Sequence, residues 1–181
     1  MIKVGITGQS GFVGSHLYNF LGLKSGIQRI HFEDNYFNNA SLMSEFAGNC
    51  DVIVHLAAMN RHEDPNLLYN TNIDLVGKLI SGLEASGNRP RVIFSSSTQE
   101  ELENHYGRSK KEGRLMFEKW AAYSGASFTA MVIPNVFGPY GKPHYNSVVA
   151  TFSHLLTHGG EPQIHVDGEL KLIYINELVD Q

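Results

Sequence analysis

The sequence predicts an α/β fold built on a doubly wound parallel sheet. Short apolar runs that resemble strands alternate with longer segments of helical periodicity. Such alternation is typical of parallel sheets that carry helices on both faces. Three glycines, spaced three apart, separate the first apolar run from the first helical segment. A chain of 181 residues is long enough for one domain with a sizeable core.

The expected elements follow one another regularly through most of the chain. The apolar runs predict strands at residues 3–7, 29–32, 52–56, 91–95 and 127–133. Helical periodicity predicts helices at residues 13–23, 66–84 and 106–123, with one short helix around residues 41–46. In folds of this kind, ligands bind beyond the carboxyl ends of the strands.

The last third of the chain has a different character. The segment "PNVFGPYGKPHYNS" is rich in Pro, Gly and Asn, and it predicts a long loop over residues 134–147. Loops of that length in compact domains are usually functional. We expect a helix at residues 147–158 and two short strands at residues 163–166 and 170–174.

The composition argues against several classes of function. The net charge is −4, whereas proteins that bind nucleic acid or anionic membranes favour basic surfaces. The chain has no apolar run of membrane-spanning length and no signal peptide before its first strand. Cys50 is its only cysteine, so an intrachain disulfide is impossible. We therefore expect a cytoplasmic protein with no nucleic-acid or membrane partner.

The first motif is "VGITGQSGFVGSHL", in which Gly8, Gly11 and Gly14 lie between a strand and a helix. Glycine permits the tight turn and lets the backbone approach a pyrophosphate closely. The helix N-terminus then offers N–H groups and partial positive charge to that phosphate. The alternative is a tight turn without a ligand. The candidate cofactor-binding residues of this segment are Gly8, Gln9, Ser10, Gly11, Phe12, Val13 and Gly14.

The G-x-x-G-x-x-G spacing resembles the extended branch of the short-chain dehydrogenase/reductase superfamily, the NAD-dependent epimerase/dehydratase family. This branch contains nucleotide-sugar epimerases, dehydratases and reductases. The resemblance implies a Rossmann-like fold over residues 1–133, a nicotinamide cofactor and a nucleotide-sugar substrate.

The second expected strand ends in "HFEDN", which places Glu33 and Asp34 about 20 residues beyond the glycines. A carboxylate there would bind the adenosine ribose hydroxyls and repel a 2′-phosphate. Both NAD and NADP stay open as cofactors, with NAD slightly favoured. The alternative is a solvated turn at the end of a strand.

The third expected strand is followed by small residues, in "HLAA", a form that this branch commonly shows. Leu56, Ala57 and Ala58 would let the cofactor lie on the edge of the sheet, whereas His55 is expected to be structural. Asn72 matches an asparagine that the superfamily often uses to support the active-site lysine through water. The alternative for Asn72 is a plain residue on the helix surface.

A tyrosine and a lysine stand one helical turn apart in "YGRSK". Tyr106 and Lys110 share one helix face, and a nearby ammonium lowers the pKa of a phenol. Tyr106 could then exchange a proton with a substrate alcohol or carbonyl, while Ser97 bonds the same oxygen. The order of "FSSS" and "YGRSK" matches the catalytic signature of the superfamily. The candidate catalytic residues are Ser97, Tyr106 and Lys110.

Four stretches of the sequence narrow the resemblance. "HLAAMNR", "SSSTQ", "YGRSKKEG" and "PNVFGPYGKPHYNSVVATF" resemble the reductase domain of CapF-type capsular polysaccharide enzymes. The resemblance implies reduction of the 4-keto group of a UDP-linked N-acetylated deoxysugar. It also implies that residues 134–181 are a substrate-binding loop and an incomplete C-terminal region of the same domain. In relatives, a metal-binding cupin domain follows this region.

The resemblance also assigns residues in the loop after the fifth expected strand. Pro134 is a candidate cofactor contact. The candidate substrate contacts are Ser97, Asn135, Lys142, Tyr145 and Asn146. For the last three, the alternative is a structural loop that caps the following helix.

Three hypotheses for the function stay open. The first is a 4-keto nucleotide-sugar reductase, the second an epimerase or dehydratase with tightly held NAD, and the third a cofactor-binding sensor or scaffold without turnover. The serine, tyrosine and lysine argue against the third. His154 and His158 have a spacing that could bind metal, but no third ligand is evident, so we expect no metal site.

The two long helices also suggest self-association. Apolar residues on helices 66–84 and 106–123 lie beyond the active-site face, and the equivalent helices of the superfamily often pair across a two-fold axis. We therefore expect a homodimer. The apolar residues in question are Leu75, Leu79, Leu115 and Trp120.

Overall fold

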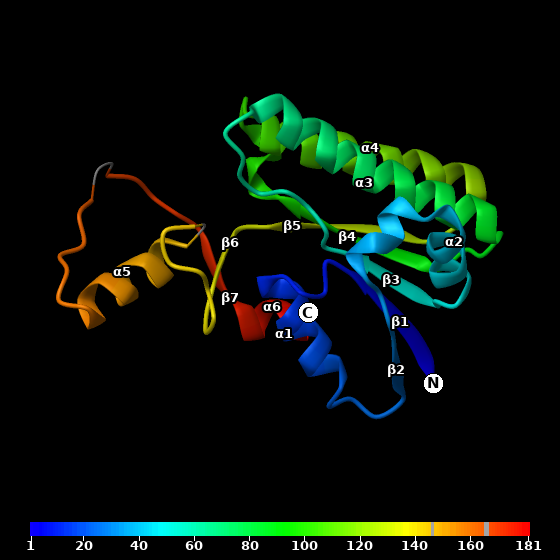
Figure 1. Ribbon diagram of the computed structural model, residues 1–181, viewed down its shortest axis with the longest axis horizontal. Helices are drawn as coiled ribbons and strands as arrows, with labels where there is room; N and C mark the ends of the chain where they lie inside the picture. Colours follow the sequence, from blue (N-terminus) through cyan, green and yellow to red (C-terminus); the bar gives the residue numbers. More distant parts are fainter. Residues whose placement is uncertain (146, 165–166) are drawn as a thin grey trace. The chain divides into compact units, whose positions relative to one another are not determined.

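The computed structural model describes residues 1–145, 147–164 and 167–181. The chain forms two compact units, Met1–Val132 and Ile133–Gln181. The first unit is a parallel sheet with helices on both of its faces (Figure 1). This is the predicted Rossmann-like α/β architecture.

The central sheet has five strands in the order β2-β1-β3-β4-β5. Its strands are β1 (Ile2–Thr7), β2 (Ile27–Ile30), β3 (Val52–His55), β4 (Arg91–Ser97) and β5 (Phe128–Ile133). The strand β1 pairs in parallel with β2 on one side and with β3 on the other. The chain therefore adds β2 on one side of β1 and then crosses to add β3 on the other side. Open α/β sheets bind ligands at this switch point, beyond the carboxyl ends of the strands.

The helices are distributed over both faces of this sheet (Figure 1). α3 and α4 run side by side over one face, next to α2, and α1 lies on the opposite face. The helical segments of the first unit are α1 (Phe12–Leu21), η1 (Asp34–Asn38), α2 (Ala40–Gly48), α3 (Pro65–Ser86), η2 (Thr98–Glu101) and α4 (His105–Ser124).

Local sequence signals set the limits of the two long helices. The side chain of Asp64 accepts hydrogen bonds from the first turn of α3, and Pro65 fits the first helical position. Asn104 caps α4 in the same way. Both helices end at a glycine with positive φ, Gly87 at 67° and Gly125 at 74°, a conformation that costs other residues free energy.

The hydrophobic core lies between the sheet and the layer of α2, α3 and α4. Phe32, Phe94 and Phe117 are among its largest fully buried side chains. Two residues that the sequence analysis placed on an outer face, Leu79 and Trp120, also lie in this core. That part of the dimer argument is wrong, because these side chains pack inside the unit.

Several strand limits differ by one or two residues from those predicted, and two of these differences affect residues of the core or the site. β2 ends at Ile30 rather than at residue 32, although Phe32 is buried: its side chain joins the core from a loop position. β4 continues two residues further than predicted, to Ser97, so the whole serine run belongs to the strand.

The second unit contains a two-stranded parallel sheet of β6 (Asn135–Phe137) and β7 (Leu172–Tyr174), with α5 (Val148–Thr157) and α6 (Ile175–Asp180). β6 lies within the segment that was predicted to be loop throughout. The strand predicted at residues 163–166 is not found at Gln163 and Ile164, which lie in no strand, and residues 165–166 lie outside the described part.

Candidate active site

The glycine turn after β1 is built for close backbone contact. Gly8 has φ 71°, and a Cβ added there would lie 2.8 Å from the backbone nitrogen of Ala57. A Cβ added at Gly14 would lie 2.2 Å from the carbonyl oxygen of Gly8. The turn after β1 therefore lies directly against the segment that follows β3, as the predicted roles of these glycines require.

The first turn of α1 offers unused N–H groups in the described structure. Its N-cap residue, Gly11, has no side chain to occupy them, and no acidic residue stands in the first turn. The Nε2 of Gln9 donates to the carbonyl oxygen of Phe32, 2.8 Å away, and its buried Oε1 has no hydrogen-bond partner among the described residues. This cradle fits the pyrophosphate of a dinucleotide, because it combines bare backbone donors with the positive end of a helix.

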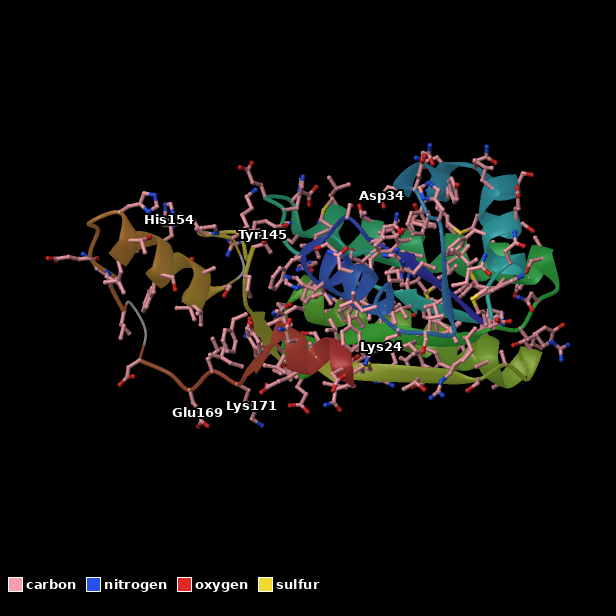
Figure 2. All side chains as sticks on the ribbon, turned by 90° about the horizontal axis from the view of Figure 1, so that it is seen from below. Lys24, Asp34, Tyr145, His154, Glu169 and Lys171 are labelled. Atoms are coloured by element: carbon pink, nitrogen blue, oxygen red, sulfur yellow. The ribbon has the colours of Figure 1, made fainter. Side chains whose placement is uncertain are left out.

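The same glutamine joins the glycine turn to the end of β2. The two acidic residues predicted to contact ribose follow Phe32 there, and Figure 2 labels the second of them, Asp34. Glu33 is exposed and bonds His31 at 3.0 Å and Asn35 at 3.2 Å. The hydrogen bond from His31 lowers the pKa of the Glu33 carboxyl group.

A buried histidine on β3, His55, joins the ends of β1 and β3 by a side-chain hydrogen bond. The Nδ1 of His55 lies 2.7 Å from Thr7 Oγ1, which also accepts a bond from the backbone nitrogen of Ala57. The His55 ring stacks on Phe94. Complete burial, with a smaller effect of the charge on Lys110, lowers the pKa of His55 to about 3. The neutral ring thus belongs to the scaffold, as its position in the strand predicted.

Asn72 is buried, so the alternative of a helix-surface asparagine is wrong. Its amide oxygen accepts from the backbone nitrogen of Met59 at 2.7 Å, and its amide nitrogen donates to the Met59 carbonyl and to Ser109 Oγ. Asn72 therefore fastens the loop after β3 to both α3 and α4. Ser109, rather than Lys110, is its described partner on α4.

Lys110 is buried on the α4 face that meets the end of β4. Its Nζ donates to the carbonyl oxygen of Ser95 at 2.9 Å and lies 5.7 Å from the centre of the Tyr106 ring. Burial lowers the pKa of Lys110 to about 8, and the negative charge of Glu100 acts in the opposite direction. The structure thus places an ammonium with a lowered pKa beside the predicted proton donor.

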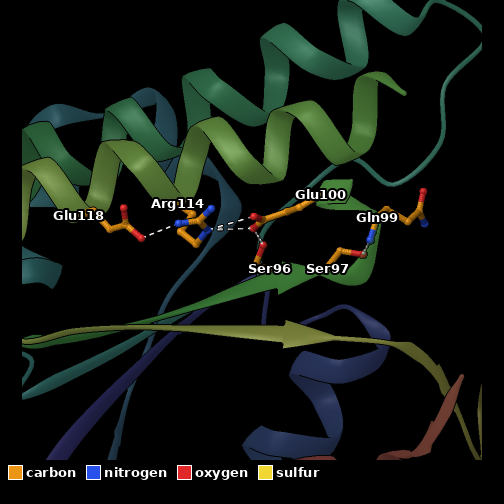
Figure 3. A network of polar contacts seen from close by, with 6 residues as sticks. All are labelled: Ser96, Ser97, Gln99, Glu100, Arg114 and Glu118. Atoms are coloured by element: carbon orange, nitrogen blue, oxygen red, sulfur yellow. Dashed lines mark hydrogen bonds and ion pairs between the residues drawn. The ribbon is translucent and has the colours of Figure 1, made fainter. Parts of the chain in front are cut away.

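Ser96 and Ser97, at the end of β4, use their hydroxyl groups in different ways. Ser96 donates to the carboxylate of Glu100, whereas the Oγ of Ser97 accepts from the backbone nitrogen of Gln99 at 3.1 Å (Figure 3). Among the described contacts, the O–H of Ser97 is not used as a donor. Ser97 therefore suits a role that requires donation to a substrate oxygen better than Ser96 does.

Gly107 is a close-packing position next to Tyr106 that the sequence analysis did not single out. A Cβ added there would lie 1.9 Å from the carbonyl oxygen of Gln99, so η2 rests directly on α4 beside Tyr106. The signal was present, because this glycine follows the tyrosine in "YGRSK". Glu100 and Arg114, which join the two elements next to it, were also missed.

The second unit holds the remaining predicted residues. Pro134 precedes β6, and Asn135 opens it with a backbone bond to the carbonyl oxygen of Lys171. The Nζ of Lys142 lies 5.2 Å from the ring centre of Tyr145, which Figure 2 labels. Asn146, the last predicted substrate contact, lies outside the described residues.

Two further features concern metals and membranes. The rings of His154 and His158 lie in contact with their centres 4.1 Å apart and their planes tilted by 35°. Within the described part of the chain no three His, Cys, Asp or Glu side chains are grouped to hold a metal ion. None of the described helices combines the length and the apolar character needed to cross a bilayer.

Known proteins resemble this chain over nearly its full length. A UDP-2-acetamido-2,6-beta-L-arabino-hexul-4-ose reductase from Pseudomonas aeruginosa is 32% identical over 179 residues, which are 98% of this chain and 48% of that protein. The crystal structure of the capsular polysaccharide assembling protein CapF from Staphylococcus aureus is 27% identical, with a TM-score of 0.82 over 99% of this chain and 47% of that one.

A UDP-N-acetylglucosamine 4-epimerase from Methanobrevibacter ruminantium M1, solved with UDP-N-acetylmuramic acid, is 25% identical and has a TM-score of 0.82. The match covers 99% of this chain and 71% of that one. The chain thus spans about half the length of the reductase and of CapF. The sequence model of the NAD dependent epimerase/dehydratase family matches residues 4–180, and the chain belongs to that family.

Proposed function

We propose that this chain is the dinucleotide-binding part of a nucleotide-sugar oxidoreductase that reduces the 4-keto group of a UDP-linked deoxysugar. One observation carries the proposal: Lys110 is buried beside Tyr106 and bonds the strand end that presents Ser97. The 32% identity to a UDP-linked 4-keto sugar reductase supports the choice of substrate.

In this proposal Ser97, Tyr106 and Lys110 each have a separate role in protonating the keto oxygen. Ser97 donates a hydrogen bond to the keto oxygen and holds it towards Tyr106. Tyr106 protonates that oxygen as it becomes an alkoxide. The ammonium of Lys110 favours the phenolate that remains, so the tyrosine can lose and regain its proton near neutral pH. A nicotinamide cofactor, when bound, would supply the hydride that reduces the carbonyl carbon.

The residues around the glycine turn would hold the cofactor. The backbone N–H groups at the start of α1 would hold the pyrophosphate, and Glu33 or Asp34 would bind the adenosine ribose. A carboxylate in that place disfavours a 2′-phosphate, so we propose NAD(H) as the preferred cofactor over NADP(H). Pro134, Asn135, Lys142, Tyr145 and Asn146 keep their proposed roles as cofactor and substrate contacts.

Absorbance of the reduced cofactor tests this proposal. The protein is mixed with a UDP-linked 4-keto-2-acetamido-2,6-dideoxyhexose and with NADH or NADPH in turn. Stoichiometric loss of reduced cofactor, faster with NADH, supports the reductase. Parallel calorimetric titrations with NADH and NADPH measure cofactor binding without turnover. A chain that binds neither dinucleotide overturns the proposal, and a clear preference for NADPH overturns the role of the acidic pair.

An epimerase or dehydratase is the second candidate, favoured by the family and by the likeness to a 4-epimerase structure. These reactions return the hydride to the sugar, so they form product without net loss of reduced cofactor. Chromatography of the UDP-sugars from the same mixtures separates the two reactions. New sugar nucleotide with constant cofactor absorbance would favour this candidate over the reductase.

A further inference from the structure

The carboxylate of Glu100 lies between the serine strand end and the helix that carries Tyr106 and Lys110. It accepts a hydrogen bond from Ser96 on β4 (Figure 3). Both of its oxygens also accept from the Nε of Arg114 on α4, at 3.2 and 3.0 Å. The Glu100 side chain is only 10% exposed. Removing one partner of a pair so shielded from water leaves the other charge uncompensated, which costs more than the loss of a surface ion pair.

Glu100 and its partner Arg114 each lie close to a proposed catalytic residue in the chain. Glu100 belongs to η2, the short helix that starts directly after Ser97. Arg114 follows Lys110 by one turn of α4, and a second carboxylate, that of Glu118, anchors its other end at 2.6 Å. The chain from Ser96 through Glu100 to Arg114 thus ties the catalytic strand end to the catalytic helix.

The charge of Glu100 also acts on the buried lysine. The titratable groups whose charge state bears on Lys110 are neutral His55 on β3 and Glu100 on η2, and the centre of the Tyr106 ring on its own helix lies 5.7 Å from the Lys110 Nζ. Of these groups, Glu100 is the one that favours the charged lysine against the effect of burial. An ionised Lys110 near neutral pH therefore depends in part on this carboxylate.

We propose that Glu100 is a positioning residue of the active site: through its bonds to Ser96 and Arg114 it holds the end of β4 and η2 against α4, and its negative charge supports the ammonium of Lys110. This proposal rests on the proposed function for its catalytic meaning, because Ser97 and Lys110 act on substrate only in that reaction. The geometry itself belongs to the first unit and can be tested without substrate.

Three variants separate the two effects. Glu100→Gln removes the charge and weakens the bond to Arg114. Ser96→Ala removes one hydrogen bond and keeps the charge. Glu118→Gln is the matched control, since it removes an equal charge from the outer end of Arg114. Nuclear magnetic resonance of the full chain gives two measurements for each, the pH titration of the Lys110 ε-methylene and the hydrogen exchange of the Gln99 amide.

The expected pattern differs for each variant. Glu100→Gln moves the titration midpoint of Lys110 below its value of about 8 and speeds exchange of the Gln99 amide about tenfold. Ser96→Ala speeds the same exchange and leaves the titration in place. Glu118→Gln changes neither. An unchanged Lys110 midpoint in Glu100→Gln, or unchanged exchange in both Glu100→Gln and Ser96→Ala, overturns the proposal.

Titration of the same samples with NADH separates this proposal from the function. None of the described contacts of Glu100 involves the glycine turn, so Glu100→Gln is expected to bind NADH within a few-fold of the parent. A parent chain that binds no dinucleotide overturns the proposed function, while the Lys110 titration and the Gln99 exchange still decide the role of Glu100.

Discussion

A lysine that leaves water needs compensation inside the protein, and Lys110 receives it from the end of β4. The Ser95 carbonyl oxygen accepts a hydrogen bond from the Lys110 ammonium, and Glu100 provides charge of opposite sign. His55, on the neighbouring strand, stays neutral and adds no competing charge, because its pKa is lowered to about 3. With its pKa lowered to about 8, Lys110 therefore stays mostly charged at neutral pH, although burial has narrowed the margin.

Tyr106→Phe tests the proposed proton donor. The ring keeps its packing but loses its exchangeable proton, so we expect turnover to fall by about 10² to 10⁴ and NADH affinity to stay within a few-fold. Steady-state rates and calorimetry measure the two effects. Tyr123→Phe, on the same helix but 89% exposed, is the control and should match the parent. Activity of Tyr106→Phe close to that of the control would disprove the assignment.

Lys110→Met is expected to stabilise the chain near neutral pH. Folding lowers the pKa of Lys110 from 10.5 to about 8, so the buried ammonium costs on the order of 3 kcal/mol below about pH 8. Between these values the unfolded state binds more protons, and the stability of the parent rises with pH. The advantage of the variant should therefore shrink from about pH 8 to about pH 10.5.

Urea unfolding of Lys110→Met and the parent across this pH range measures the advantage. Lys111→Met replaces an exposed neighbour and should change the free energy of unfolding by less than about 0.5 kcal/mol. An advantage that does not vary with pH would show that the charge on Lys110 is not its cause.

At the scale of elements, the contact between η2 and α4 depends on a missing side chain. Gly107→Ala would place a methyl group 1.9 Å from the carbonyl oxygen of Gln99, a backbone atom that cannot move alone. We expect a loss of about 1–3 kcal/mol in the free energy of unfolding, with displacement of η2.

Gly77→Ala is the matched control, since its added methyl group would lie 3.8 Å from Met116. This substitution, in the middle of α3, should stabilise by up to about 1 kcal/mol. Thermal and urea unfolding of both variants provide the measurement. A Gly107→Ala protein as stable as Gly77→Ala would mean that η2 does not rest on α4 as described.

The sequence predicted the elements whose signals are local. α3 was predicted from its apolar periodicity, and its limits differ from those expected by two residues at most: Asp64 and Gly87 define them chemically. The three-residue strand β6 was missed because its pairing partner, β7, follows much later in the chain. Short strands without local alternation depend on such distant pairing, which periodicity does not reveal.

The candidate site shows the same division. Tyr106 and Lys110 were found because one helical turn brings them together. Glu100 was missed because its partner Arg114 stands fourteen residues away on another element. Its role depends on how η2 packs against α4, and no spacing in the sequence reports that packing.

For the whole molecule, the outer face of the long helices predicts self-association. Leu115 on α4 is 36% exposed, whereas Leu79 and Trp120 are inside the core and cannot contribute. We expect sedimentation at micromolar concentration to give twice the mass of the chain. Leu115→Glu should then give a monomer. Leu23→Glu, at a position 85% exposed just after α1, should stay a dimer. A monomeric parent would contradict this prediction.

The described contacts that shape the glycine turn and the serine strand end all come from residues before Ile133. Gly8 meets Ala57, Gln9 reaches Phe32, and Lys110 reaches Ser95, each within the first unit. Substitutions in residues 133–181 therefore leave these contacts intact. For the proposed oxidoreductase the consequence is evolutionary: substitutions in the second unit could alter sugar preference, while the proposed hydride and proton chemistry of the first unit stays under separate selection.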